Sequence, residues 1–193
     1  MTTQHDDQPG SAADPTSSRG RAPLLLTATL AEPVQALFQT LRNQHFPADR
    51  NVVPVHVSLF HHLPGEARAP IVRRLQALAL GDLPERPVVR VEAPFPLGRG
   101  VAFRLQAPVL QRIRAELARD WAAWLTPQDA QGWRPHVTVQ NKVEPPTARA
   151  LLDQLARGFV PFETEAASLQ LWRYLDGPWE LLDTFALKQR VPG

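Results

Sequence analysis

Two short stretches decide the expected fold and site: VHVSLF at residues 55–60 and HVTVQ at residues 136–140. Apolar and polar residues alternate in both, which is typical of a β-strand with one buried face. Because side chains at i and i+2 of a strand share a face, His56 lies beside Ser58 in the first stretch. The second stretch opens with a histidine and a threonine in the same relation. We therefore expect two strands that each carry a polar row of one imidazole and one hydroxyl.

The segments around these stretches follow one order of elements that occurs twice along the chain. Short apolar runs predict strands, and apolar stripes at three- and four-residue spacing, often opened by proline, predict helices. The expected strands are residues 24–30, 55–60, 88–91, 101–105, 136–140, 167–174 and 179–187. The expected helices begin near Pro33, Glu66, Pro108 and Pro145. The pattern in each half of the sequence thus predicts a strand, a helix, a strand that carries the histidine and hydroxyl residues, a second helix and a closing strand.

The two polar rows contain the groups that displacement at phosphorus requires. An imidazole titrates near neutral pH, so one ring accepts a proton while its counterpart donates one. Hydroxyl groups donate hydrogen bonds to phosphate oxygens and stabilise the charge of the transition state. We therefore predict that His56 and His136 form an acid–base pair in a shared cleft. Ser58 and Thr138 are the predicted phosphate-binding residues, and the chemistry needs no metal.

Three further side chains near the rows are candidate substrate contacts. Phe60 has the parity of His56 and Ser58, so we expect it on the cleft face, where it stacks on a base or packs between lobes. Trp133 and Arg134 directly precede His136 and are expected at the cleft rim. The Arg134 guanidinium is suited to bind a second phosphate.

The composition excludes several classes of protein. The chain has 193 residues and no cysteine, which removes disulfide scaffolds, iron–sulfur clusters and thiol nucleophiles. A net charge of +2 favours short or terminal nucleic-acid substrates over long duplexes. The sequence contains no apolar run long enough to span a membrane and no secretory signal pattern. We expect a cytoplasmic protein without a membrane partner.

A metal site is an alternative interpretation of the histidines. His61 and His62 follow the first stretch, and His56 would be a third ligand. Strand parity, however, places His61 on the face opposite His56, and His62 far along the strand. The interpretation we adopt assigns no metal ligands and no cofactor.

The paired motifs also carry a family resemblance. The tetrapeptides HVSL at 56–59 and HVTV at 136–139 resemble the His-x-Ser/Thr-hydrophobic motifs of the two-histidine (2H) phosphoesterase superfamily. The nearest branch is the RNA 2′,5′-ligase/2′,3′-cyclic phosphodiesterase family. The order of elements from Leu24 to Leu187 is similar too.

This resemblance implies a fold and an activity. The fold is α+β and bilobal with pseudo-twofold symmetry, having two antiparallel sheets, outer helices and a central V-shaped cleft. The activity is metal-independent opening of a 2′,3′-cyclic phosphate to a 2′-phosphate, with reversible 2′,5′ ligation in some members. The implied partners are RNA ends or small cyclic or 2′,5′-linked nucleotides.

The remaining expectations concern organisation and rival functions. Residues 1–22 are polar and predict a disordered tail, and residues 23–193 predict a single domain, expected to be monomeric. A nucleotide-binding module without turnover and a metal hydrolase are the rival functions. The residues leave open the natural substrate, the hydrolase or ligase direction, and which histidine is the acid.

Overall fold

The computed structural model describes residues 20–81 and 87–188. Its strands are β1 (Leu24–Leu30), β2 (Val57–Leu63), β3 (Val88–Pro96), β4 (Val101–Gln106), β5 (His136–Gln140), β6 (Phe162–Tyr174) and β7 (Trp179–Ala186). Its α-helices are α2 (Val34–His45), α3 (Arg68–Leu80), α4 (Pro108–Asp120), α5 (Pro127–Ala130) and α6 (Pro145–Ala156). Short 3-10 turns occupy Ala48–Arg50, Gly65–Ala67 and Ala122–Trp124. The expected order of strands and helices is confirmed, and the short helix α5 is an addition to it.

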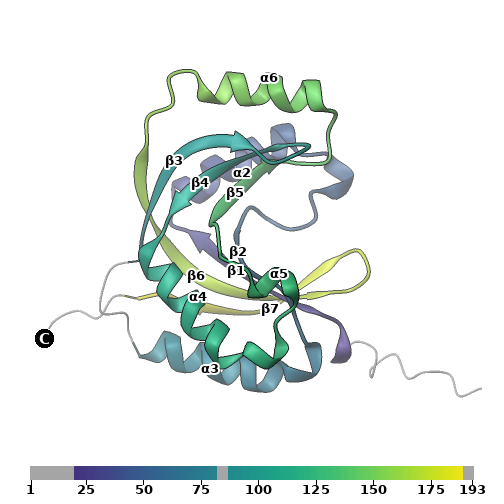
Figure 1. Ribbon diagram of the computed structural model, residues 1–193, viewed down its shortest axis with the longest axis vertical. Coiled ribbons are helices and arrows are strands. Elements are labelled where there is room, and N and C mark those ends of the chain that lie inside the picture. The colour runs from purple at the N-terminus through teal and green to yellow at the C-terminus, as the bar shows by residue number, and fades with distance from the viewer. Residues whose placement is uncertain (1–19, 82–86, 189–193) are drawn as a thin grey trace, which may run out of the picture.

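All strand pairs are antiparallel, and they form one seven-stranded sheet in the order β2-β1-β6-β3-β4-β5, with β7 also paired to β6. The expected α+β class is confirmed. The two expected sheets are halves of one sheet, because β6 belongs to both. Its first residues, Phe162–Glu165, pair with β3, and its later residues pair with β1 and β7. The sheet is strongly curled (Figure 1).

The curling brings the two ends of the sheet together. The histidine strands β2 and β5 are its edge strands, yet they contact each other. Where β6 passes from one half to the other, the pairing with β1 shifts by one residue between Ser168 and Ala166. This shift leaves Ala167 as an extra residue in β6, as in a β-bulge. Bulges bend the strand that contains them, and this one lies where the two halves of the sheet join.

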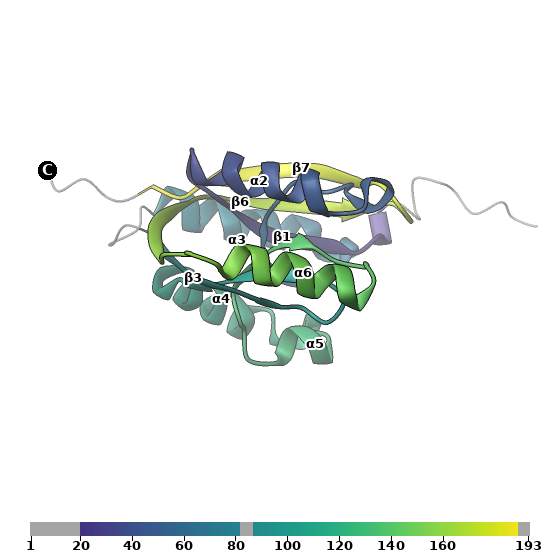
Figure 2. The ribbon, with the colours of Figure 1, turned by 90° about the horizontal axis from the view of Figure 1, so that it is seen from above.

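The first helix of each half packs on the opposite half. On α2, the Phe38 ring contacts Phe103 of β4 at a centroid distance of 5.1 Å, and α2 also lies along β5. Trp121, directly after α4, contacts Phe60 of β2 at 5.3 Å. The molecule therefore carries α2 and α6 at the β3–β4–β5 end, and α3 and α4 at the other end (Figure 1). Seen from above, α2 and α6 are nearest the viewer (Figure 2).

The core lies between the sheet and these helices. Leu26, Leu59, Leu117 and Leu169 are fully buried and come from both halves of the chain. Burial of each such side chain contributes about 1.5–3 kcal/mol to the free energy of unfolding. The larger of two buried clusters joins residues of both halves, and a smaller one consists of Leu25, Val53 and Trp172.

The chain before β1 needs a revised boundary. Residues 1–19 of the expected tail lie outside the described residues, but Gly20–Ala22 pack against the segment after β2. A Cβ atom at Gly65 would collide with the backbone of this segment, so only glycine fits there. None of the helices in residues 20–81 and 87–188 is long and apolar enough to cross a membrane.

Candidate active site

The two histidine–hydroxyl rows have the predicted alternation. His56 directly precedes β2, which contains Ser58, whereas His136 and Thr138 both belong to β5. All four residues are half-buried, while the intervening Val57 and its counterpart in β5 are buried. The core thus fixes the backbone of each row and leaves its polar side chains partly accessible.

Both histidine rings are held in the same way. The Nδ1 atom of His56 lies 2.7 Å from the Pro54 carbonyl oxygen, and that of His136 lies 2.9 Å from the Arg134 carbonyl oxygen. A carbonyl oxygen only accepts hydrogen bonds, so Nδ1 carries the proton in each ring. The neutral form of each ring therefore has its lone pair on Nε2. In both rows the hydrogen bond to residue i−2 selects the tautomer and orients the ring.

His56 is the more strongly perturbed of the titratable groups in the rows. Burial, together with repulsion from Arg42, His61 and His136, lowers its pKa to about 4, although the hydrogen bond to Pro54 opposes this shift. His56 is therefore neutral at pH 7, with a free lone pair on Nε2. Repulsion from His136 is the smallest of these contributions to the pKa of His56.

A buried arginine from the opposite half supports each histidine strand. Arg42 of α2 is 6% exposed, and its Nη1 donates to the Thr138 carbonyl oxygen at 3.0 Å. Arg114 of α4 is 8% exposed, and its Nε donates to the Leu59 carbonyl oxygen at 3.4 Å. These oxygens belong to edge strands, where carbonyl groups would otherwise lack partners. The pair of arginines repeats the pseudo-twofold arrangement of the two rows.

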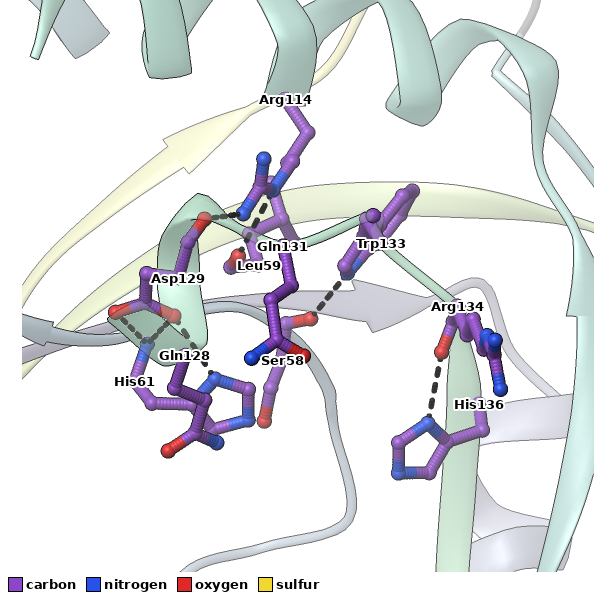
Figure 3. A pocket seen from close by; sticks show the side chains of 11 residues that line it. Ser58, Leu59, His61, Arg114, Gln128, Asp129, Gln131, Trp133, Arg134 and His136 are labelled. Atoms are coloured by element: carbon purple, nitrogen blue, oxygen red, sulfur yellow. Dashed lines mark hydrogen bonds and ion pairs between the residues drawn. The ribbon is translucent and has the colours of Figure 1, made fainter. Parts of the chain in front are cut away.

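A cavity of about 500 Å³ opens beside the rows. Its lining includes Ser58, His61, Gln128, Asp129, Gln131, Trp133, Arg134 and His136 (Figure 3). Of the predicted site residues, the cavity thus brings together Ser58, Trp133, Arg134 and His136. His56 and Thr138 lie outside its lining, and His56 is linked to the cavity through its electrostatic interaction with His61 and His136.

Phe60 does not lie on the cleft face, which corrects the expectation from strand parity. The pairing of β2 with β1 shifts by one residue between Ser58 and Phe60, which leaves Leu59 as an extra residue. Both Leu59 and Phe60 are fully buried as a result. The Phe60 ring packs against Trp121 and lies under the Arg114 guanidinium, which is 4.6 Å from its centroid. A fully buried ring in this position is a core side chain and offers no surface to a base.

Two shifts change the expected positions of the next two histidines: the one at Leu59, and a second between Phe60 and Leu63, where the pairing with β1 is again irregular. His61, expected on the face opposite His56, lines the cavity with Ser58, whereas His62 is exposed and lies outside the lining. Asp129 of α5 is 1% exposed and lies behind His61, with its Oδ1 3.0 Å from Nδ1 of the ring. Its carboxylate also accepts the backbone N–H groups of His61 and His62. Burial tends to raise the pKa of Asp129, but these hydrogen bonds lower it below its usual value.

The segment that contains α5 caps the free edge of β2. The indole Nε1 of Trp133 donates to the Ser58 carbonyl oxygen at 2.8 Å. Arg114 also donates to the Asp129 carbonyl oxygen, so α4, this segment and β2 form one hydrogen-bond network. Trp133 is therefore both a lining residue of the cavity and a support of the first row.

Sequence reasoning missed several residues of the site. Arg42 and Arg114 lie on helices whose apolar stripes they interrupt, which was the available signal. Asp129 lies on the short helix α5, which no pattern predicted. Phe95 of β3 contacts the His136 ring edge-to-face at 6.0 Å, and the Arg104 guanidinium lies 5.4 Å from the Phe95 centroid. Phe95 follows the expected strand at 88–91, which continues to Pro96 in the structure.

The metal-site alternative concerns His61 and its neighbours. Within residues 20–81 and 87–188, no three His, Cys, Asp or Glu side chains gather as metal ligands would. His61 is paired with the carboxylate of Asp129 in a two-residue interaction.

The fold and the paired rows define a class of protein. An α+β fold with a curled antiparallel sheet and two His-x-Ser/Thr edge strands is that of the two-histidine phosphoesterases. The sequence model of the 2′-5′ RNA ligase superfamily matches residues 30–178, and the chain belongs to this family. Membership in this family supports an enzymatic activity of the phosphoesterase or ligase type.

Solved structures share the fold at low sequence identity. The chain is similar to TT0787 of Thermus thermophilus, with a TM-score of 0.57 and 19% identity over 88% of this chain and 100% of that chain. It is also similar to a structure described as a phosphoesterase, with a TM-score of 0.51 and 20% identity over 88% and 99% of the two chains. E. coli LigT complexed with NADP+ gives a TM-score of 0.50 and 18% identity over 88% and 99%. No curated protein matches the sequence.

Proposed function

We propose that the protein is a metal-independent phosphodiesterase that opens 2′,3′-cyclic phosphates at RNA or nucleotide ends. The observation that carries the proposal is the repeated ring arrangement: His56 and His136 each bond a carbonyl oxygen through Nδ1 and keep Nε2 for chemistry. Two such rings on facing edge strands supply one base and one acid to a phosphate held between them. The family assignment and the complex of E. coli LigT with NADP+ support a nucleotide as the ligand class.

The lowered pKa of His56 assigns the roles in the hydrolytic direction. Neutral His56 takes a proton from water at Nε2, and the water oxygen forms a bond to phosphorus. The bond from phosphorus to the ribose 3′-oxygen breaks, and His136 donates a proton to that oxygen. The product is a 2′-phosphate with a free 3′-hydroxyl. When a 5′-hydroxyl replaces water in this same step, the product is a 2′,5′ linkage with a free 3′-hydroxyl. In the reverse reaction the 3′-oxygen attacks phosphorus, the 5′-oxygen leaves, and the two rings exchange roles.

The hydroxyl groups and the arginines complete the proposed site. Ser58 and Thr138 donate hydrogen bonds to the non-bridging phosphate oxygens, whose charge rises in the transition state. Arg42 acts through the Thr138 backbone and is a positioning residue, and its positive charge also disfavours protonation of His56. Each proton transfer contributes a factor of about 10²–10⁴ to the rate.

The test uses a short RNA that ends in a 2′,3′-cyclic phosphate, incubated with the full chain in excess EDTA. The wild-type protein is expected to form a 2′-phosphate, and both His56→Ala and His136→Ala are expected to lose at least about 10²-fold in rate. His62→Ala is the matched control, because its side chain is exposed and lies outside the cavity lining. Full activity in either catalytic variant would contradict the mechanism.

The same assay distinguishes the rival functions. Binding of the RNA without product would identify a nucleotide-binding module, and activity lost in EDTA would identify a metal hydrolase. A 3′-phosphate product would contradict the proposed leaving group, because it requires cleavage of the bond to the 2′-oxygen.

A further inference from the structure

His61 lines the cavity together with His136, and the proposed chemistry does not use it. Its side chain is 42% exposed, and it lines the cavity together with Ser58 and His136. Figure 3 shows its ring pointing into the same space as the Ser58 side chain. The exposure allows contact with a bound molecule close to the reacting phosphate.

Asp129 fixes the orientation of this ring. The carboxylate accepts hydrogen bonds from Nδ1 and from two backbone N–H groups, so Nδ1 carries the proton and Nε2 is directed away from Asp129. An aspartate that is 1% exposed is costly to bury, and a network of this kind must satisfy its charge. Arg114 contributes to that compensation through its charge and its bond to the Asp129 carbonyl oxygen.

The charges around the cavity favour a second anion. The lining carries Arg114, Arg134, His61 and His136 as basic groups, and Asp129 is its single carboxylate. That carboxylate is occupied by the N–H groups of β2, so its charge is turned away from the open space. Gln128 and Gln131 add amide groups on the same side of the cavity (Figure 3). The volume of about 500 Å³ exceeds what one phosphate needs.

We propose that His61, held by Asp129, forms a subsite for a second phosphate group of the substrate, adjacent to the phosphate that reacts. This subsite rests on the proposed function, because it places the second phosphate relative to the acid–base pair. The ligand class is a nucleotide that carries a 5′-phosphate or an internucleotide phosphate beside its terminal 2′,3′-cyclic phosphate. Asp129 is a positioning residue, since it acts through the His61 ring.

A phosphate oxygen only accepts hydrogen bonds, so both ring nitrogens of His61 act as donors in the occupied subsite, Nδ1 to Asp129 and Nε2 to the phosphate. The charged and titratable groups around the ring are Asp129 behind it, Arg114 beyond Asp129, His56 at the start of β2, and His136 and Arg134 in the cavity lining. Only the affinity for a ligand with the second phosphate should depend on His61.

The test compares equilibrium binding of adenosine 2′-monophosphate and adenosine 2′,5′-bisphosphate, measured by calorimetry at pH 6. At pH 6 the wild-type protein is expected to bind the bisphosphate about 10-fold more tightly than the monophosphate, which is the gain expected from one charge-assisted hydrogen bond. His61→Asn keeps an N–H donor near Asp129 and removes Nε2, so it is expected to bring this preference close to one. His62→Asn is the matched control and should keep the wild-type preference.

The outcomes separate this inference from the proposed function. If the wild-type protein opens cyclic phosphates but binds the bisphosphate no more tightly than the monophosphate, the subsite is overturned and the proposed function stands. A preference lost in His61→Asn, in a protein without turnover, would support the subsite and overturn the chemistry. A preference that His61→Asn retains at full size would refute the subsite, provided that near-ultraviolet circular dichroism shows a native fold.

Discussion

His56 and His136 share one hydrogen-bond arrangement but differ in their surroundings. Each ring is fixed by the carbonyl oxygen two residues before it, at 2.7 Å and 2.9 Å. Burial, together with repulsion from Arg42 and His61, lowers the pKa of His56 to about 4. The His136 ring instead packs edge-to-face against Phe95. Two similar side chains in the same motif thus lie in different surroundings, and the lowered pKa of His56 comes from its surroundings and not from the motif.

The pKa of His56 predicts how stability depends on pH. A folded pKa of about 4 lies below the unfolded value of 6.5, so the unfolded chain binds more protons between these values. The free energy of unfolding should therefore fall as the pH falls from about 6.5 to about 4. Gln at position 56 does not titrate, so His56→Gln should lose less stability on acidification. From pH 7 to pH 4.5, the free energy of unfolding of the wild-type protein should fall by about 1–3 kcal/mol more than that of His56→Gln.

Urea unfolding of both proteins at pH 7 and pH 4.5 measures this difference. The lower pH stays above the usual value of 3.8 for the Asp129 carboxyl, whose pKa is lowered further. Asp129 therefore remains ionised in both measurements. An equal loss of stability in the two proteins would contradict the perturbed state of His56.

At the residue scale, sequence reasoning predicted the alternation of the two rows but not the positions of the residues after Ser58. Period-two alternation predicts the faces of His56 and Ser58, and the burial of the intervening valine agrees. One extra residue at Leu59 then reverses the parity, which buries Phe60 and turns His61 to the cavity. A bulge of this kind has no clear sequence signal, because Leu and Phe are ordinary strand residues.

Edge strands are the elements on which this site is built. An edge strand exposes backbone groups, and here side chains from other elements bind them: Arg42, Arg114, Asp129 and Trp133. The helices that supply the two arginines were predicted as amphipathic segments. Their partners were not predictable, because an apolar stripe shows which face is buried and not what covers it.

Arg42→Met tests whether α2 tunes the chemistry of the site. Arg42 lowers the pKa of His56 and holds the Thr138 backbone, so its removal should raise that pKa towards 6.5. The acid limb of the kcat/KM profile, expected at about 4 in the wild-type protein, should move to higher pH. A fall in kcat/KM with an unmoved acid limb would mean that Arg42 has only a structural role.

Gly100→Ala tests how closely β4 and β5 approach at the start of β4. A Cβ atom there would collide with the Gln140 carbonyl oxygen, which is backbone and has little freedom to move. We expect a loss of about 1–3 kcal/mol in the free energy of unfolding, as for other overpacked sites. Gly132→Ala is the control, since nothing lies within 4 Å of its Cβ position. Equal melting temperatures for the two variants would contradict the close approach.

At the scale of the whole molecule, the two halves of the chain are not separate folding units. Each half places its first helix on the other half, and β6 pairs with strands of both. The repeated order of elements was evident in the sequence, but this exchange was not. It depends on long-range contacts, such as Phe38 with Phe103, that local periodicity does not encode.

The exchange predicts the behaviour of chain fragments. Residues 1–84 contain β1, β2, α2 and α3 but lack the strands and helices against which they pack. We expect this fragment, and its complement 85–193, to show no cooperative thermal transition alone, and their mixture to recover one. Circular dichroism on heating measures this. A cooperative transition in either isolated fragment would show that its half folds without the other.

The extra residue Ala167 in β6 has a consequence for the spacing between the two rows. It belongs to neither row, yet it lies at the joint where one continuous strand changes direction between the halves. We therefore expect the spacing between β2 and β5 to depend on this bend in β6, although Ala167 lies in neither strand. Deleting or adding a residue there should change that spacing while the histidine and hydroxyl residues keep their own strands.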